Sequence, residues 1–270
     1  MSPALSTQIA WRHRAALCLA ALLVLTGACS TAEQSKPSQS SESSQSPSSE
    51  LQAPAPPQVP ILERDGDAYR VPDPLPAGAP GTLLAATPSR ISETFEGATR
   101  IELLYLSDNR TDQPVAVSGT LLIPSGAAPK DGWPIVSWGH GTTGVADVCA
   151  PSTTDNLFYN EYAQQVRSLL SAGYAVAASD YIGLATPGPH TYSVGVDLGN
   201  AMADIVPAAR AANTTLSKTW FAIGHSEGGQ AALFATRSAS RHPDLPLAAT
   251  VAIAPTSSLG SALPAIISGG

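Results

Sequence analysis

The residues around Ser226 have the types and spacing expected around a nucleophilic serine. Ser226 lies within GHSEGG, Gly224 to Gly229, with one glycine two residues before it and another two residues after it. An apolar, β-rich run at 219–226 leads into this segment, and a small-residue, helix-like run at 227–241 follows it. G-x-S-x-G between a strand and a helix is typical of a serine nucleophile on a sharp, strained turn, where larger side chains than glycine would collide. The alternative is a structural turn that is only rich in glycine.

A nucleophilic serine needs two N–H donors for the oxyanion that forms when it attacks an acyl carbon. The first is the backbone N–H of Glu227, which opens the predicted helix. The second is expected in the loop SWGHGTTGVADVCAPS, where His140 and Gly141 precede Thr142 as in an HG-type oxyanion motif. We select the N–H of Thr142, with its hydroxyl as a helper, and Thr143 takes this role if the loop register differs by one. The alternative is a plain turn of glycine and threonine.

The elements that must position these groups alternate between strands and helices. Six apolar, β-rich runs predict strands at 99–108, 114–124, 133–140, 174–180, 219–226 and 247–255. Three segments predict helices, at 156–173, at 198–212 with Pro207 as a kink or entry point, and at 227–241. Near-continuous apolar strands that alternate with helices predict an α/β fold, with a mostly parallel sheet and helices on both faces.

Five stretches together resemble the secretory lipases of the α/β-hydrolase superfamily, the group that includes fungal lipase A, in their bacterial branch. They are PVAVSGTLLIP, HGTTGVADVCAPS, AGYAVAASDYIGLATPGPHTY, ADIVPAARAA and GHSEGGQAA, and the resemblance covers Gly81 to the end. It implies the α/β-hydrolase fold and hydrolysis of carboxylic esters, including triacylglycerols, through attack by Ser226 and an acyl-enzyme. It implies no metal and no organic cofactor, and H-E-x-x-H does not occur. The family counterpart of Cys149 is disulfide-linked to a cysteine further on.

The serine also needs a histidine base and a carboxylate, which follow it in this superfamily in the order Ser, Asp or Glu, His. His242 and Asp244 follow Ser226, but they stand in the reverse order in a link between a helix and a strand, so we reject them. We therefore expect the domain to lack its last strands, with the acid and the base, either as an N-terminal portion of a longer lipase or as a truncated gene product. The alternative is a non-catalytic cell-surface lipoprotein of hydrolase ancestry that binds lipid or a surface partner.

Other polar residues near the motifs are interpreted as structural. His225 is expected to pack or form hydrogen bonds away from the serine, and Asp204 and Arg210 to face solvent or pair locally. Four residues match family positions near the acyl pocket, namely Asp180, Tyr181, His190 and Tyr192. For these residues we favour a structural role in supporting the loop over a catalytic one.

The first 28 residues have the features of a signal peptide. Arg12 and Arg14 provide a basic region, and an apolar region of about 14 residues, shorter than a membrane span, runs from Ala15 to Ala28. The segment ends LTGACS, which resembles a bacterial lipobox with Cys29 as the lipid-attachment residue. Ordinary signal cleavage and an uncleaved membrane anchor are the alternatives.

A Ser/Pro-rich tract follows and is expected to be a disordered tether at 29–60, leaving the hydrolase domain at 61–270. The protein is then exported and either lipid-anchored on the outer face of the cell membrane or secreted. A net charge of −7 disfavours nucleic acid as a partner. No obligate protein partner is evident, and the expected partners are an ester or lipid substrate and the membrane surface.

Overall fold

A computed structural model of the protein describes residues 68–89, 93–257 and 260. All of these residues fall in one unit, Ala53–Gly270. The signal peptide at 1–28 and the tether at 29–60 lie outside the described residues, so both stay predictions.

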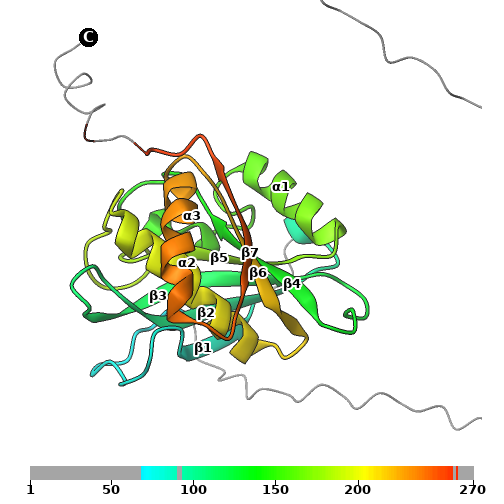
Figure 1. Cartoon of the computed structure of the whole chain (residues 1–270), viewed down its shortest axis with the longest axis horizontal. Coiled ribbons are helices and arrows are strands. Elements are labelled where there is room, and N and C mark those ends of the chain that lie inside the picture. The colour runs from blue at the N-terminus through cyan, green and yellow to red at the C-terminus, as the bar shows by residue number, and fades with distance from the viewer. Residues whose placement is uncertain (1–67, 90–92, 258–259, 261–270) are drawn as a thin grey trace, which may run out of the picture. The chain divides into compact units, whose positions relative to one another are not determined.

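A seven-stranded sheet forms the centre of this unit, in the order β1-β2-β3-β5-β4-β6-β7 (Figure 1). The first three strands and β5 are joined by antiparallel pairings, whereas β5, β4, β6 and β7 run parallel. Six of the strands were predicted, and the seventh is the N-terminal edge strand β1. The bounds are β1 Leu83–Pro88, β2 Thr99–Asp108, β3 Pro114–Ile123, β4 Trp133–Gly139, β5 Ala175–Tyr181, β6 Leu216–His225 and β7 Leu247–Ile253.

Helices cover both faces of the sheet, which confirms the predicted α/β fold. α1 (Asn160–Ser171) packs on one face, and α2 (Gly195–Ala212) and α3 (Glu227–Ser238) pack on the other (Figure 1). Successive side chains of a strand point to opposite faces, so Ile135 of β4 joins the core under α2 while Val136 joins the core under α1.

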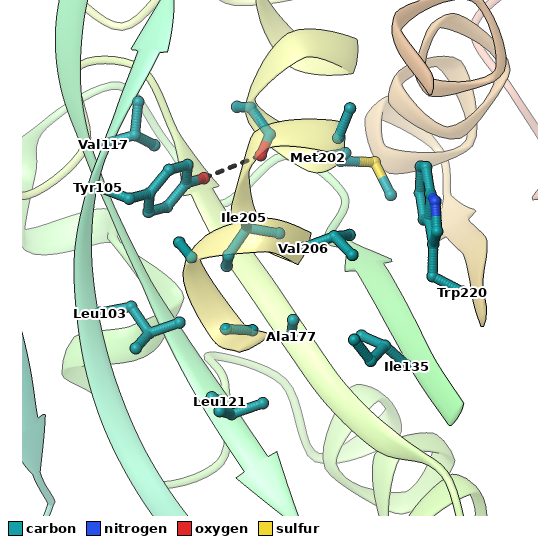
Figure 2. Close-up of a cluster of buried hydrophobic side chains, with 14 of the residues drawn as sticks. Leu103, Tyr105, Val117, Leu121, Ile135, Ala177, Met202, Ile205, Val206 and Trp220 are labelled. Atoms are coloured by element: carbon teal, nitrogen blue, oxygen red, sulfur yellow. Dashed lines mark hydrogen bonds between the residues drawn. The ribbon is translucent and has the colours of Figure 1, made fainter. Parts of the chain in front are cut away.

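The larger core lies between the sheet and α2 (Figure 2). Leu103 and Leu121 from the antiparallel strands and Trp220 from β6 are at most 1% exposed there. Tyr105 donates its O–H to the carbonyl of Ala201 at 2.9 Å, so its polar end is satisfied inside the core (Figure 2). This packing fixes α2 against the strands that carry the site.

α2 continues through Pro207, where the sequence predicted a kink or an entry point. The helix is buried almost all round because the sheet lies on one side of it and α3 on the other.

Asp204 of α2 corrects the expectation that it faces solvent or pairs locally. It is completely buried and accepts hydrogen bonds from Ser107 at 2.7 Å and from Arg241 at 3.2 Å. His242 Nε2 also lies 2.7 Å from its Oδ1, so this histidine serves a buried network at the end of α3 opposite Ser226.

Candidate active site

Ser226 forms the turn between β6 and α3 in a conformation that is rare for a residue with a side chain. Its backbone has φ 57° and ψ −118°, and it is the N-cap residue of α3. Its N–H donates to the carbonyl of Ile253 at 2.9 Å, and its carbonyl accepts the N–H of Gln230 at 3.1 Å. The neighbouring strand and the first turn of the helix therefore hold the strained residue from both sides.

Glycines let three backbone segments meet beneath this serine. A Cβ atom on Gly224 would lie 2.1 Å from the carbonyl oxygen of Gly228, and one on Gly228 would lie 2.0 Å from the carbonyl oxygen of Gly139. Neither distance is compatible with a side chain, because the atoms that a Cβ would meet are backbone carbonyl oxygens, which cannot rotate away as a flexible side chain can. The end of β4, the end of β6 and the start of α3 thus touch through their main chains, as the GHSEGG pattern predicts.

A pocket with a volume of about 320 Å³ opens at Ser226 and brings the loop after β4 to the serine. Gly141 and Thr142 come from that loop, and Tyr159, Glu161 and Tyr162 come from the start of α1 and the residue before it. The full lining is Gly141, Thr142, Tyr159, Glu161, Tyr162, His225 and Ser226.

Two groups at the pocket are already engaged. The N–H of Gly141 donates to the hydroxyl oxygen of Tyr162 at 3.0 Å. The same hydroxyl lies 3.0 Å from Nδ1 of His225, whose ring is turned to α1 and not to Ser226. Gly141 is therefore not a free donor, and His225 has the packing position that the sequence suggested.

The backbone N–H groups of Thr142 and Glu227 remain available to a ligand. Within the described residues, neither takes part in a hydrogen bond. The hydroxyl of Thr142, expected to help at the oxyanion, instead donates to Oε2 of Glu227 at 3.0 Å. The hydroxyl of Thr143, the alternative donor residue, is buried without a partner in the described part of the chain.

The side chain of Glu227 is the feature of this site that sequence reasoning missed. It is 2% exposed and accepts the N–H of Ser193 at 3.0 Å as well as the hydroxyl of Thr142. Nε2 of His190, whose side chain is 1% exposed, lies 3.7 Å from Oε1 of Glu227. The signal in the sequence was a carboxylate placed directly after the elbow serine, where the helix must pack closely.

Opposing effects set the ionisation of this pair. Burial raises the pKa of Glu227, but His190, the N–H of Ser193 and the hydroxyl of Thr142 outweigh burial and lower it. Burial lowers the pKa of His190, but Glu227 and the carbonyl of Ile182 outweigh it and raise the pKa. The two groups therefore favour an imidazolium beside a carboxylate.

Asp180, Tyr181 and His140 support the loops around the pocket. Asp180 accepts hydrogen bonds from Ser118 and from the N–H and hydroxyl of Ser152, and burial raises its pKa. Tyr181 donates to the carbonyl of His140 at 3.0 Å and stacks on its ring. Burial lowers the pKa of His140, which favours its neutral form.

None of the four described histidines forms a hydrogen bond with the hydroxyl of Ser226. The partners are the carbonyls of Gly141 and Asp180 for His140, the carbonyl of Ile182 for His190, Tyr162 for His225 and Asp204 for His242. In the part of the chain that the structure covers, no cluster of three or more His, Cys, Asp or Glu could hold a metal ion. The helices of that part include none with the length and apolar character to cross a membrane.

Cys149 lies in the loop after β4 with a free thiol, so the disulfide implied by the family resemblance has no counterpart among the described residues. Its sulfur packs closely on Gly144, where a Cβ atom would lie 2.4 Å from it.

The sheet order and the strained serine between β6 and α3 define the α/β-hydrolase fold, and solved structures agree. Lipase A of Candida antarctica in its closed state matches with 22% identity and a TM-score of 0.58, over 68% of this chain and 45% of that one. The rice cell wall degrading esterase LipA from Xanthomonas oryzae matches with 25% identity and a TM-score of 0.52, over 64% and 49%. The chain thus spans about half the length of these structures.

Residues 153–267 match the sequence model of the family described as secretory lipase. This match confirms the resemblance to secretory lipases that the sequence motifs indicated, and it includes Ser226 and Glu227 but not Thr142. A search of curated proteins finds no match.

Proposed function

We propose that this chain carries the nucleophile and the oxyanion donors of a carboxylic ester hydrolase of the secretory lipase type. The observation that carries the proposal is Ser226, strained at φ 57° between β6 and α3 and open to a pocket shared with Thr142. Strain of this kind persists where surrounding structure holds it, and a nucleophile elbow is a site that uses it. The family match over 153–267 supports the same chemistry.

The geometry supports acyl transfer through a covalent intermediate. Oγ of Ser226 forms a bond to the acyl carbon as its proton passes to a base, and the carbonyl oxygen becomes an oxyanion. The free N–H groups of Glu227 and Thr142 donate to that oxygen. The intermediate then collapses, the alcohol leaves with the proton, and water releases the acid from the acyl-enzyme by the same steps.

The proposal assigns the nucleophile and the two donors and leaves the base unassigned, because the described histidines are engaged elsewhere. Without a base a serine hydroxyl is a poor nucleophile. A residual acceleration of about 10³- to 10⁴-fold over water, which comes from binding and an oxyanion hole alone, would not depend on Ser226.

The proposed substrate is an ester of a lipid or another carboxylic acid. The pocket offers the rings of Tyr159 and Tyr162 beside Ser226. The similar proteins are a lipase and a cell wall degrading esterase.

We further propose that residues 1–28 direct export, that Cys29 carries a lipid and that 29–60 tether the domain 61–270 to the outer face of the membrane. The secretory family supports export.

Hydrolysis of p-nitrophenyl butyrate by the purified protein tests this function. Ser226→Ala is expected to lower the rate by 10²-fold or more, whereas Ser240→Ala, at an exposed position, leaves it unchanged. A fluorophosphonate probe is expected to label the unsubstituted protein and not Ser226→Ala. Equal hydrolysis by the protein and Ser226→Ala would exclude the proposed nucleophile.

A further inference from the structure

The buried carboxylate of Glu227 raises an electrostatic problem for the proposed reaction. Its backbone N–H is offered to an oxyanion, yet its own side chain is a second anion, 2% exposed and joined by a hydrogen bond to Thr142, the other donor residue. Like charges repel strongly where water is excluded, so an uncompensated carboxylate would oppose the transition state that the N–H stabilises. Compensation by a neighbouring cation is therefore a requirement of this arrangement.

His190 is placed to provide that compensation. Its Nδ1 lies 2.9 Å from the carbonyl of Ile182, which orients the ring, and Nε2 faces Oε1 of Glu227 at 3.7 Å. A carbonyl on one nitrogen and a carboxylate on the other both favour the doubly protonated ring. Burial of both side chains strengthens their attraction.

Glu227 also connects the two proposed oxyanion donors. Its Oε2 accepts the hydroxyl of Thr142, whose own N–H is the second donor, and its Oε1 accepts the N–H of Ser193. The carboxylate therefore holds the loop after β4 and the loop before α2 against the first turn of α3. A neutral side chain at 227 preserves these hydrogen bonds only in part, since Gln offers one acceptor oxygen where Glu offers two.

We propose that His190 and Glu227 are positioning residues of the oxyanion site, in which Glu227 holds the donor loop through Thr142 and the His190 imidazolium cancels the charge of Glu227. This inference rests on the proposed ester hydrolysis. His190 is not proposed to touch the substrate or the reacting atoms, because its ring acts through Glu227.

The groups that face the pair come from every element around it. His140 from the loop after β4 and Tyr181 at the end of β5 approach it, with Tyr181 stacked on His190 at 6.4 Å. The ring centroids of His190 and Tyr192, which share a loop, lie 6.4 Å apart. Tyr162 of α1, whose hydroxyl accepts the N–H of Gly141, interacts electrostatically with Glu227. Burial lowers the pKa of His140, so this neighbour is neutral near pH 7 and does not compete for the carboxylate.

A charge-cancelling role predicts rescue, which a structural role does not. We expect His190→Gln to lower kcat for p-nitrophenyl butyrate by about 10²-fold at pH 6, where His190 is charged, with KM little changed, and Glu227→Gln by about 10-fold. The double variant should recover to within about 10-fold of the unsubstituted protein, because the charge and its partner leave together. Glu96→Gln, at an exposed carboxylate, is the matched control.

The pH profile supplies a second readout. The unsubstituted protein should lose activity as pH rises through the pKa of His190, and the double variant should lack that loss. A double variant no faster than His190→Gln, with Ser226→Ala inactive, overturns the inference and leaves the proposed function standing. Equal rates for the protein and Ser226→Ala overturn the proposed function instead.

Nuclear magnetic resonance tests the ion pair between His190 and Glu227 without measuring catalytic activity. His190 ring signals, assigned by their loss in His190→Gln, should titrate above the usual pKa of about 6.5 and move lower in Glu227→Gln. Titration at or below that value in the unsubstituted protein overturns the inference whether or not the protein hydrolyses esters.

Discussion

Substitution of Gly228 by alanine tests whether backbone contact holds the serine turn. The new Cβ would lie 2.0 Å from the carbonyl oxygen of Gly139 and 2.7 Å from that of His140, where ordinary contact begins at 3.4 Å. The start of α3 must therefore move by more than 1 Å. Overpacking of this kind costs about 1–3 kcal/mol, and alanine in a helix gains about 1 kcal/mol over glycine. Because both opposing atoms are backbone, we expect a net loss of about 2 kcal/mol.

Urea denaturation followed by tryptophan fluorescence measures this loss, and ester hydrolysis by the same samples reports the serine. Displacement of a reacting group by about 1 Å costs on the order of 10²-fold in rate. Gly260→Ala is the control, since none of the described residues lies within 4 Å of its Cβ position, and it should stay within about 0.5 kcal/mol of the unsubstituted protein. A Gly228→Ala protein as stable as the Gly260→Ala protein would refute the close-contact argument.

Three further predictions concern buried polar groups. Asp204→Asn should cost about 2–3 kcal/mol in urea denaturation, because it weakens the hydrogen bonds of the buried carboxylate with Arg241 and His242 while Arg241 keeps Asp108, whereas exposed Asp131→Asn should be neutral. Tyr105→Phe should cost about 1–2 kcal/mol in the same assay through loss of its buried hydrogen bonds. The stability contributed by His190 and Glu227 should be full between about pH 4.5 and 6.5. It should be lost as pH rises through the raised pKa of His190 or falls through the lowered pKa of Glu227, measured against the double glutamine variant.

Five of the six predicted strands agree with the structure to within two residues at each end, and β6 begins three residues earlier than predicted. The runs at 99–108 and 114–124 became β2 and β3 with bounds Thr99–Asp108 and Pro114–Ile123. β1 was missed because LLAATP shows no alternation and ends in proline, and its existence depends on antiparallel pairing with β2. The start of α2 at Gly195 was missed because Val194 supplies no side-chain cap and Pro207 resembles a break.

Burial of charge was the property that the sequence predicted least well. Asp204 and Glu227 stand in segments that read as ordinary helices, and a carboxylate on a helix normally faces water. Their partners lie far away in the chain, such as Ser107 for Asp204 and His190 for Glu227. Only tertiary structure brings these groups together, so the local sequence pattern could not identify their partners. The elbow serine was predictable because the flanking glycines are required by the close approach of backbone segments at the turn, which is a local feature of the sequence.

The site depends on the carboxyl ends of four parallel strands meeting at one edge of the sheet. β4 ends before Thr142, and β6 ends at His225, directly before Ser226. β7 supplies the Ile253 carbonyl that holds the Ser226 N–H, and β5 leads into the loop of His190. The strain at a non-glycine residue with positive φ is on the order of 1–3 kcal/mol. A single hydrogen bond of about 1 kcal/mol does not offset it, so the contacts from neighbouring strands must act together. Loosening any one of them is therefore expected to move the serine before it unfolds the sheet.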